Sequence, residues 1–518
     1  MIESSVNKDN TSKNKKIAKN TLLLYFRLFI TMIIGLFTSR VVLNTLGVSD
    51  YGVYNVVAGF VTMFSLLTGS LSAAISRFLT YNLGKGDLKK LQVVFSSSIT
   101  IMIAMSVIVI LLAELFGLWF LNSQLNIPGG RIEAANWVFH FAVISFAINL
   151  ISVPYNASII SHERMDAYAY ISILEVTLKL VIVYMLYVSP FDKLVTYSFL
   201  LLVVSIVIRC VYGVYCSKVF AECHYSFVFD KSLLKEMGSF AGWNLMGSGA
   251  YLFNTQGVNI VTNIFFSVTT NAARGIANQV EGIAKQFVTN FTTAINPQIT
   301  KSYATGDINY MHSLICRGAK FSYLLMLFFV VPFMFETETI MRLWLKTYPP
   351  EAPLFLRLSM IGTMFDMLGN STANAAWATG NIKKYYIIIG TVGSLVFPIS
   401  WICFLFGAPA YSSYIVFAVI YIAVMVLKVY IIKDLVSFPP RLFYSDVLKP
   451  IILTTIMAFI IPEVLYSLIT ESLFRTILVV LFSLISVGIS CYLFGLSGFE
   501  RNRINNVITA RINVITRK

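Results

Sequence analysis

Four polar residues with chemistry-bearing side chains stand in one short segment, ARGIANQVEGIAKQ: Arg274, Asn278, Glu281 and Lys285. Their spacing of four, three and four residues places them on one face of an α-helix. Cations and amides on one such face can line a wet, net cationic surface inside a membrane protein. Because Glu281 and Lys285 can pair as i and i+4 residues, Arg274 is the cation without a local acid, and whether Lys285 is free for a ligand stays open.

The helix that carries this stripe lies in a very apolar chain. Of 518 residues, 57% are hydrophobic and only 12% are charged, against about 25% charged in soluble domains. Apolar runs near 20 residues long are typical of membrane-spanning helices and exclude a β-barrel. We predict an all-α polytopic membrane protein with about fourteen spans, at 20–43, 53–79, 93–120, 134–160, 166–188, 194–217, 236–265, 272–299, 318–335, 354–378, 382–406, 411–432, 447–469 and 474–495.

The net charge of +15 comes from 39 Lys and Arg, most of which fall in the two end segments and in alternate loops. This pattern follows the positive-inside rule, so we expect both chain ends in the cytoplasm and no nucleic-acid partner. The first span contains Arg27 and no small-residue cleavage pattern follows it, which indicates an uncleaved helix.

An internal repeat divides the predicted helices. Shifting the chain by 220 residues aligns 47–87 with 267–307 without a gap, and both copies end in a Gly-Asp pair, Gly86-Asp87 and Gly306-Asp307. An even number of helices separates the copies, so the repeat is parallel. We predict a cytoplasmic tail at 1–19, an N-lobe at 20–220, a C-lobe at 221–440, two extra helices at 441–496 and a basic cytoplasmic tail at 497–518.

Other polar residues lie deep in predicted spans, where each charge costs at least about 2.5 kcal/mol. The span before the stripe carries Asn244, Tyr251 and Asn259 on one face, which predicts a wet cavity or, alternatively, polar contacts between helices. Asp366 has no local partner and is the main candidate for binding a coupling ion, H⁺ or Na⁺. Glu175 is a second candidate, with a structural ion pair to Lys179 as its alternative reading.

Several further cations fall near the ends of spans. Arg77 and Lys428 lie near inner ends, where a side chain that reaches the interface is the usual account. Arg40 and Arg77 also flank the segment that the repeat pairs with the stripe, so either could line the same cavity.

The sequence has no nucleophile–base motif, no nucleotide-binding loop and no metal-ligand cluster, which indicates a carrier without a cofactor or metal. A carrier of this kind is driven by an ion gradient, the membrane potential or the gradient of its own substrate.

The stretches FTSRVVLNTLGVSDYGVYNVVAGF, ISVPYNASIISHERMDAY and TKSYATGD resemble Wzx-type polysaccharide and O-antigen flippases of the multidrug/oligosaccharidyl-lipid/polysaccharide exporter superfamily. The resemblance implies two six-helix lobes plus two C-terminal helices, as in multidrug exporters and the lipid II flippase. It also implies a cavity whose arginines correspond in type to Arg27 or Arg40, Arg77 and Arg274.

The function that this resemblance implies is the transfer of undecaprenyl-diphosphate-linked oligosaccharides across the bacterial inner membrane, in company with the polysaccharide polymerase machinery. Two alternatives stay open. A cation-coupled multidrug antiporter would favour twelve helices and an anionic cavity, and a non-transporting membrane scaffold would use the polar stripes only to hold helices together.

Overall fold

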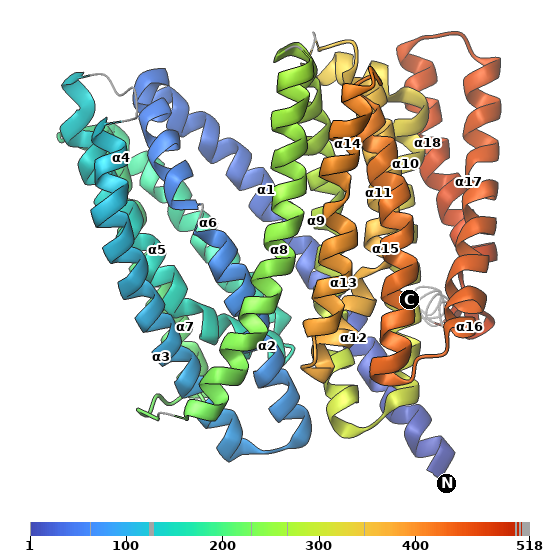
Figure 1. The fold of residues 1–518 in the computed structure, drawn as a ribbon, viewed down its shortest axis with the longest axis horizontal. Coiled ribbons are helices and arrows are strands. Elements are labelled where there is room, and N and C mark those ends of the chain that lie inside the picture. Colours follow the sequence, from blue (N-terminus) through green and yellow to red (C-terminus); the bar gives the residue numbers. More distant parts are fainter. Residues whose placement is uncertain are drawn as a thin grey trace, which may run out of the picture. The chain divides into compact units, whose positions relative to one another are not determined.

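The computed structural model describes residues 2–62, 64–123, 129–228, 230–266, 268–345, 348–502, 505–506 and 509. Within these helices, it leaves out the side chains of 2–15, 120, 129 and scattered residues of 36–67 and 250–272. Every regular element in the described residues is a helix (Figure 1). The all-α prediction is therefore confirmed.

Contacts along the chain define two compact units, one of Met1–Ser248 with Thr300–Gly306 and the other of Gly249–Ile299 with Asp307–Lys518. The first unit contains α1 (Ile2–Thr62), α2 (Ser65–Lys85), α3 (Leu88–Leu112), α4 (Leu118–Ser123), α5 (Ile132–Ser161), α6 (Met165–Val188) and α7 (Lys193–Val219). Two long helices, α8 (Lys231–Phe265) and α9 (Val268–Thr305), contribute residues to both units. The lobe boundaries expected at 220, 440 and 496 stay predictions.

The second unit contains the remaining helices. They are α10 (Ile308–Leu345), α11 (Ala352–Leu368), α12 (Asn370–Thr379), α13 (Lys383–Ser394), α14 (Val396–Leu405), α15 (Ser412–Val436), α16 (Pro440–Phe443), α17 (Lys449–Leu468) and α18 (Leu473–Ser490). Within this unit α17 packs along α18, and both contact α10 (Figure 1).

Ten helical stretches of the described residues are long and apolar enough to cross a membrane, so the protein is a multi-pass membrane protein. Four predicted spans, at 53–79, 236–265, 272–299 and 354–378, are largely helical in their described residues but are not among these ten. The α9 helix shows the reason, because it places Arg274, Glu281 and Lys285 within three turns. The total of fourteen spans is thus not confirmed and stays a prediction.

The first helix differs from the prediction of two separate spans at 20–43 and 53–79. A single helix, α1, continues from Ile2 to Thr62, and the next helix starts at Ser65. The physical reason is local: residues 20–62 contain glycines but no proline. A glycine costs a helix only about 1 kcal/mol, whereas a proline costs about 3 kcal/mol.

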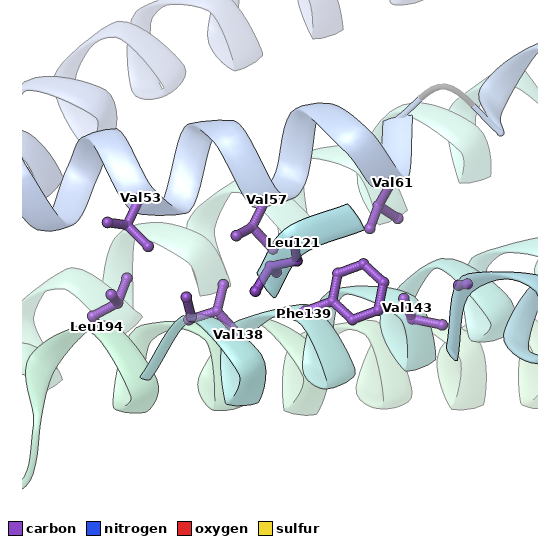
Figure 2. Packing of buried hydrophobic residues seen from close by; sticks show 10 residues of the cluster. Val53, Val57, Val61, Leu121, Val138, Phe139, Val143 and Leu194 are labelled. Atoms are coloured by element: carbon purple, nitrogen blue, oxygen red, sulfur yellow. The ribbon is translucent and has the colours of Figure 1, made fainter. Parts of the chain in front are cut away.

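A continuous apolar core holds the first unit together (Figure 2). Val53, Val57 and Val61 are spaced one turn apart on α1, and they pack against Phe139 of α5 and Leu194 of α7. This spacing is the helical periodicity that directs one apolar face inward. The packing fixes α1 against α5 and α7, and thereby positions the polar residues earlier on α1.

The two copies of the internal repeat end in the same local structure. Gly86 (φ 73°) and Gly306 (φ 79°) both adopt the left-handed conformation that closes a helix, which glycine reaches without a steric penalty. Asp87 then accepts a hydrogen bond from the Lys90 backbone N–H at 3.0 Å, and Asp307 accepts one from Tyr310 at 3.2 Å. Each aspartate caps the next helix.

Candidate functional site

The polar stripe lies on one uninterrupted helix. All of its members fall within α9, which runs from Val268 to Thr305. The predicted ion pair forms, because Lys285 Nζ lies 2.7 Å from Glu281 Oε1. The sequence therefore correctly predicted both the helix and the neutralising pair on it.

The stripe lines a pocket that belongs entirely to the second unit, with a volume of about 230 Å³. Helices α8, α9, α11, α14 and α15 supply its walls. The lining residues are Asn254, Val258, Arg274, Asn278, Glu281, Gly282, Lys285, Ser359, Val396, Ser413, Tyr414, Phe417 and Tyr421. The pocket brings together the four residues with which the sequence analysis began.

Arg274 is held in this pocket by neutral groups. Its Nε donates to Asn259 Oδ1 at 2.5 Å and its Nη1 donates to Ser413 Oγ at 3.1 Å. Its guanidinium carbon lies 4.9 Å from the centre of the Tyr414 ring, an arrangement typical of a cation–π contact. Arg274 is only 8% exposed, so its charge acts in a medium of low dielectric constant. The arrangement orients a positive charge without cancelling it.

The Glu281 carboxylate has two partners within the pocket. Besides Lys285, the Thr363 hydroxyl donates to the same Glu281 oxygen at 2.8 Å. The three ionisable side chains that would be charged in this pocket are Arg274, Glu281 and Lys285. Because one acid faces two bases, the pocket has a net positive charge.

An aromatic wall on α15 faces this charge, and sequence reasoning missed it. Tyr414, Phe417 and Tyr421 line the pocket at the three- and four-residue spacing of a helix face. This spacing was readable in the sequence, but apolar helix faces are so common in this chain that it carried no signal. Gly362 of α11 allows the Phe417 ring of α15 to pack directly against the α11 backbone, because a Cβ at position 362 would clash with that ring.

The polar residues of α8 do not share one site. Asn259 binds Arg274, as described, whereas Asn244 belongs to the first unit and accepts from Ser248 at 3.4 Å. The side chain of Tyr251 lies outside the described residues. Asn254, which was not predicted as a site residue, bridges to the Gly393 carbonyl at 2.5 Å and to the Phe397 backbone N–H at 3.3 Å. Its role is to fix α8 against α13 and α14.

A comparison with protein-family models identifies the chain. The model described as polysaccharide biosynthesis protein matches residues 17–303, which is more than half of the sequence. The chain belongs to this polysaccharide biosynthesis protein family. No curated protein matches the chain in sequence.

The fold of this family member is similar to that of solved MATE and MOP superfamily structures. One is a MATE crystal structure in complex with MaD3S, with a TM-score of 0.71 and 13% identity over 82% of this chain and 96% of that chain. A second is an outward-facing multidrug resistance MATE family transporter of the MOP superfamily, with a TM-score of 0.68, 14% identity and the same two shares. A third is a MOP superfamily transporter from Pyrococcus furiosus Vc1 (DSM3638), with a TM-score of 0.70, 13% identity and the same shares, in which the reverse polarity of the binding pocket suggests a different function. At this identity the likeness shows a shared fold.

Of the other arginines that the family resemblance suggested, Arg27 and Arg77 do not line this pocket. Arg27 stacks over the Tyr168 ring at 4.5 Å, and the Arg40 side chain lies outside the described residues. Arg77 was expected to reach the interface, but it is only 8% exposed and its Nη1 lies 3.7 Å from Glu236. All three belong to the first unit, so their contribution to a substrate cavity stays a prediction.

Both candidates for ion coupling already have a cation beside them. Glu175 pairs with Lys179 at 2.6 Å, as its alternative reading predicted. Asp366 has a partner from another helix, because Lys428 Nζ of α15 lies 3.8 Å away. Lys428 is only 7% exposed, so the expectation that it reaches the interface was wrong. A coupling ion at either carboxylate would share it with a lysine.

No group of three His, Cys, Asp or Glu side chains in the described part of the chain is placed to hold a metal ion.

Proposed function

We propose that this protein is a flippase that moves undecaprenyl-diphosphate-linked oligosaccharides across the bacterial inner membrane by alternating access. The product would serve the synthesis of O-antigen, capsular polysaccharide or exopolysaccharide. Family membership supports the pathway, and the fold shared with multidrug exporters supports transport as the activity. In this proposal both chain ends lie in the cytoplasm, and the polymerase machinery receives the product.

The observation that carries the proposal is Arg274, a buried cation in the second unit's pocket whose hydrogen bonds go to Asn259 and Ser413. A diphosphate in a membrane needs a positive charge in a site of low dielectric constant, and an arginine can bind two phosphate oxygens at once. The neutral partners fix the guanidinium in place without satisfying its charge. Arg274 would thus meet the diphosphate.

The rest of the pocket suits the sugar side of the same substrate. Asn278 and Lys285 can donate to hydroxyl groups, and the Tyr414 and Phe417 rings offer the flat apolar surface on which the C–H face of a pyranose stacks. A volume of about 230 Å³ has room for the diphosphate or one sugar ring, so the rest of the glycan and the isoprenoid tail would lie outside this pocket. Arg27, Arg40 and Arg77 are proposed as further cavity residues of the first unit, and H⁺ or Na⁺ as the coupling ion.

Net positive charge in this pocket favours an anionic substrate over the cationic drugs that a multidrug antiporter would take. The decisive experiment is deletion of the gene followed by mass spectrometry of the accumulated lipids. A flippase leaves its lipid-linked glycan behind in the inner leaflet. An antiporter instead leaves no such lipid, and its loss raises drug sensitivity.

A matched pair of variants tests the named residue. Arg274→Lys keeps the charge but loses the planar fork of donors that binds two oxygens at once, whereas Arg274→Gln removes the charge. At equal protein level, we expect Arg274→Gln to lower surface polysaccharide at least about tenfold and Arg274→Lys to lower it less. Normal polysaccharide with Arg274→Gln would instead support the scaffold alternative.

A further inference from the structure

Glu163 is a charged residue buried where α5 turns into α6. It is only 3% exposed, and it adopts a left-handed backbone conformation with φ 58°. That conformation costs a residue with a side chain about 1 kcal/mol or more. The turn that follows α12 uses Gly380 for the same purpose, with φ 78°. A charged residue stays in such a place only when its surroundings stabilise it.

The surroundings of Glu163 consist of cations from distant parts of the chain. Lys301 Nζ of α9 lies 2.5 Å from Glu163 Oε1, and Lys16 Nζ of α1 lies 3.3 Å from Oε2. Asn20 of α1 donates to the backbone carbonyl of Glu163 at 3.3 Å. One carboxylate therefore joins the α5–α6 turn to α1 and to the end of α9.

The end of α9 behaves differently from the rest of that helix. Thr300–Gly306 belongs to the first unit, whereas α9 up to Ile299 belongs to the second. Pro297 lies inside α9 just before this change. A proline removes a helix hydrogen bond and makes this position easy to bend. The end of α9 is therefore a short segment that packs within the first unit and can bend relative to the rest of its helix.

Close packing accompanies the ion pair. A Cβ added to Gly84 of α2 would lie 2.9 Å from Ala304 Cβ and 3.2 Å from Lys301 Cα. The Tyr81 and Tyr303 rings also meet, with centroids 6.4 Å apart. Only a glycine at position 84 allows α2 and the end of α9 to approach so closely.

We propose that Glu163 is a latch, whose ion pair with Lys301 holds the end of α9 on the first unit and breaks when the carrier opens toward the cytoplasm. This inference rests on the proposed function, since it assigns the latch a step in alternating access. A buried ion pair suits the task, because both charges regain hydration when it opens, which offsets the lost attraction. The strained turn also releases its strain when the contact is lost.

The test measures opening directly, without a substrate. Ala304 is only 3% exposed beneath Gly84, so an Ala304→Cys thiol reacts with a membrane-impermeant maleimide only when the latch opens. Thr305→Cys, which is exposed in the next position, reports access to the same helix end. Peptide mass spectrometry of membranes assigns the label to position 304 or 305 and separates it from the six native cysteines.

The matched variants are Glu163→Asp and Glu163→Asn. Aspartate and asparagine have the same size as each other and both tolerate a left-handed conformation, so the two variants differ in charge. The measured quantity is the ratio of the labelling rate at position 304 to that at position 305. We expect this ratio to be at least about tenfold higher in Glu163→Asn than in Glu163→Asp. Lys301→Gln and Gly84→Ala should raise it as well, the first through charge and the second through steric contact.

Equal labelling in the Asp and Asn variants would overturn the latch, because a static contact does not open with the loss of charge. If Glu163→Asn does not fold, Lys301→Gln takes its place in the comparison. Glu163 then still has its ion pair with Lys16, so the buried carboxylate is not left without a cation. The result is independent of the substrate. A deletion strain that accumulates no lipid-linked glycan would overturn the proposed function and leave a measured latch in place.

Discussion

Lys285 Nζ lies 2.7 Å from Glu281 Oε1, one helical turn earlier on α9. Both side chains are largely buried, at 19% and 13% exposure, and Thr363 donates to the same carboxylate oxygen. A pair held in this way neutralises most of its own charge, so Lys285 attracts an anion only weakly. The positive charge of the pocket is consequently concentrated on Arg274.

The first prediction compares single and paired substitutions at this ion pair. Lys285→Gln leaves Glu281 as an uncompensated anion in the pocket, whereas Glu281→Gln with Lys285→Gln restores the balance. We expect the double variant to retain several-fold more surface polysaccharide than Lys285→Gln alone, measured on silver-stained gels at equal protein level. A double variant as defective as Arg274→Gln would mean that Lys285 itself contacts the substrate.

The second prediction concerns Asp366 and Lys428, whose charged atoms lie 3.8 Å apart. Asp366→Asn leaves a buried lysine without its partner and should destabilise the protein by about 3 kcal/mol. Adding Lys428→Met should recover most of this loss, as read from the melting temperature in detergent. Asp434→Asn is the control, because Asp434 pairs with Lys384 at the surface and both are about 60% exposed. Equal effects of Asp366→Asn and Asp434→Asn would contradict the prediction.

These residues also show what the sequence could and could not predict. The Glu281–Lys285 and Glu175–Lys179 pairs were predictable, because a spacing of four residues on a helix determines that the side chains meet. The Gly-Asp turns were predictable for the same reason, since both the left-handed glycine and the capping aspartate act locally. Hydropathy likewise predicted the ten helical stretches that are long and apolar enough to cross a membrane.

Contacts between helices could not be predicted in this way. Lys428 meets Asp366, and Arg77 meets Glu236, only because packing rotates their helices toward one another. A hydropathy pattern treats each lysine or arginine near a span end as reaching for the interface, and it does not contain that rotation. The Tyr414 ring was missed for a related reason, since an aromatic residue on an apolar helix has no local signature of facing a cation.

The third prediction concerns Glu336, which anchors α18 to α10. Glu336 is 1% exposed at a kink in α10, where it accepts hydrogen bonds from Arg475 Nε at 2.9 Å and from the Thr476 hydroxyl at 2.8 Å. Glu336→Gln removes the charge that compensates buried Arg475 and should cost about 3 kcal/mol. Limited proteolysis should then cut the α17–α18 pair faster.

A neighbouring pair of the same two charge types is the control for Glu336. Arg342 and Glu471 lie 3.5 Å apart, but both are about 60% exposed. Glu471→Gln should change neither the melting temperature nor the proteolysis rate beyond experimental scatter, because exposed pairs contribute at most about 1 kcal/mol. If both variants behave alike, the burial of Glu336 has no energetic importance.

The fourth prediction is a pH dependence at the loop before α7. Asp192 accepts hydrogen bonds from the backbone N–H groups of Leu194 and Val195, at 3.0 and 3.1 Å, and from Arg131 Nη1 at 2.5 Å. Burial raises the pKa of Asp192, but the Arg131 and backbone hydrogen bonds outweigh it and leave the pKa below the ordinary 3.8. A lowered pKa in the folded state means that the carboxylate stabilises the fold above pH 3.8 and that this contribution is lost as the pH falls through the folded pKa.

Asp192→Asn keeps a helix-capping side chain but no longer titrates. We expect this variant to melt at a lower temperature than the wild type at neutral pH, and the difference to shrink toward about pH 3. Melting curves that stay parallel over this range would show that Asp192 contributes no charge-dependent stability.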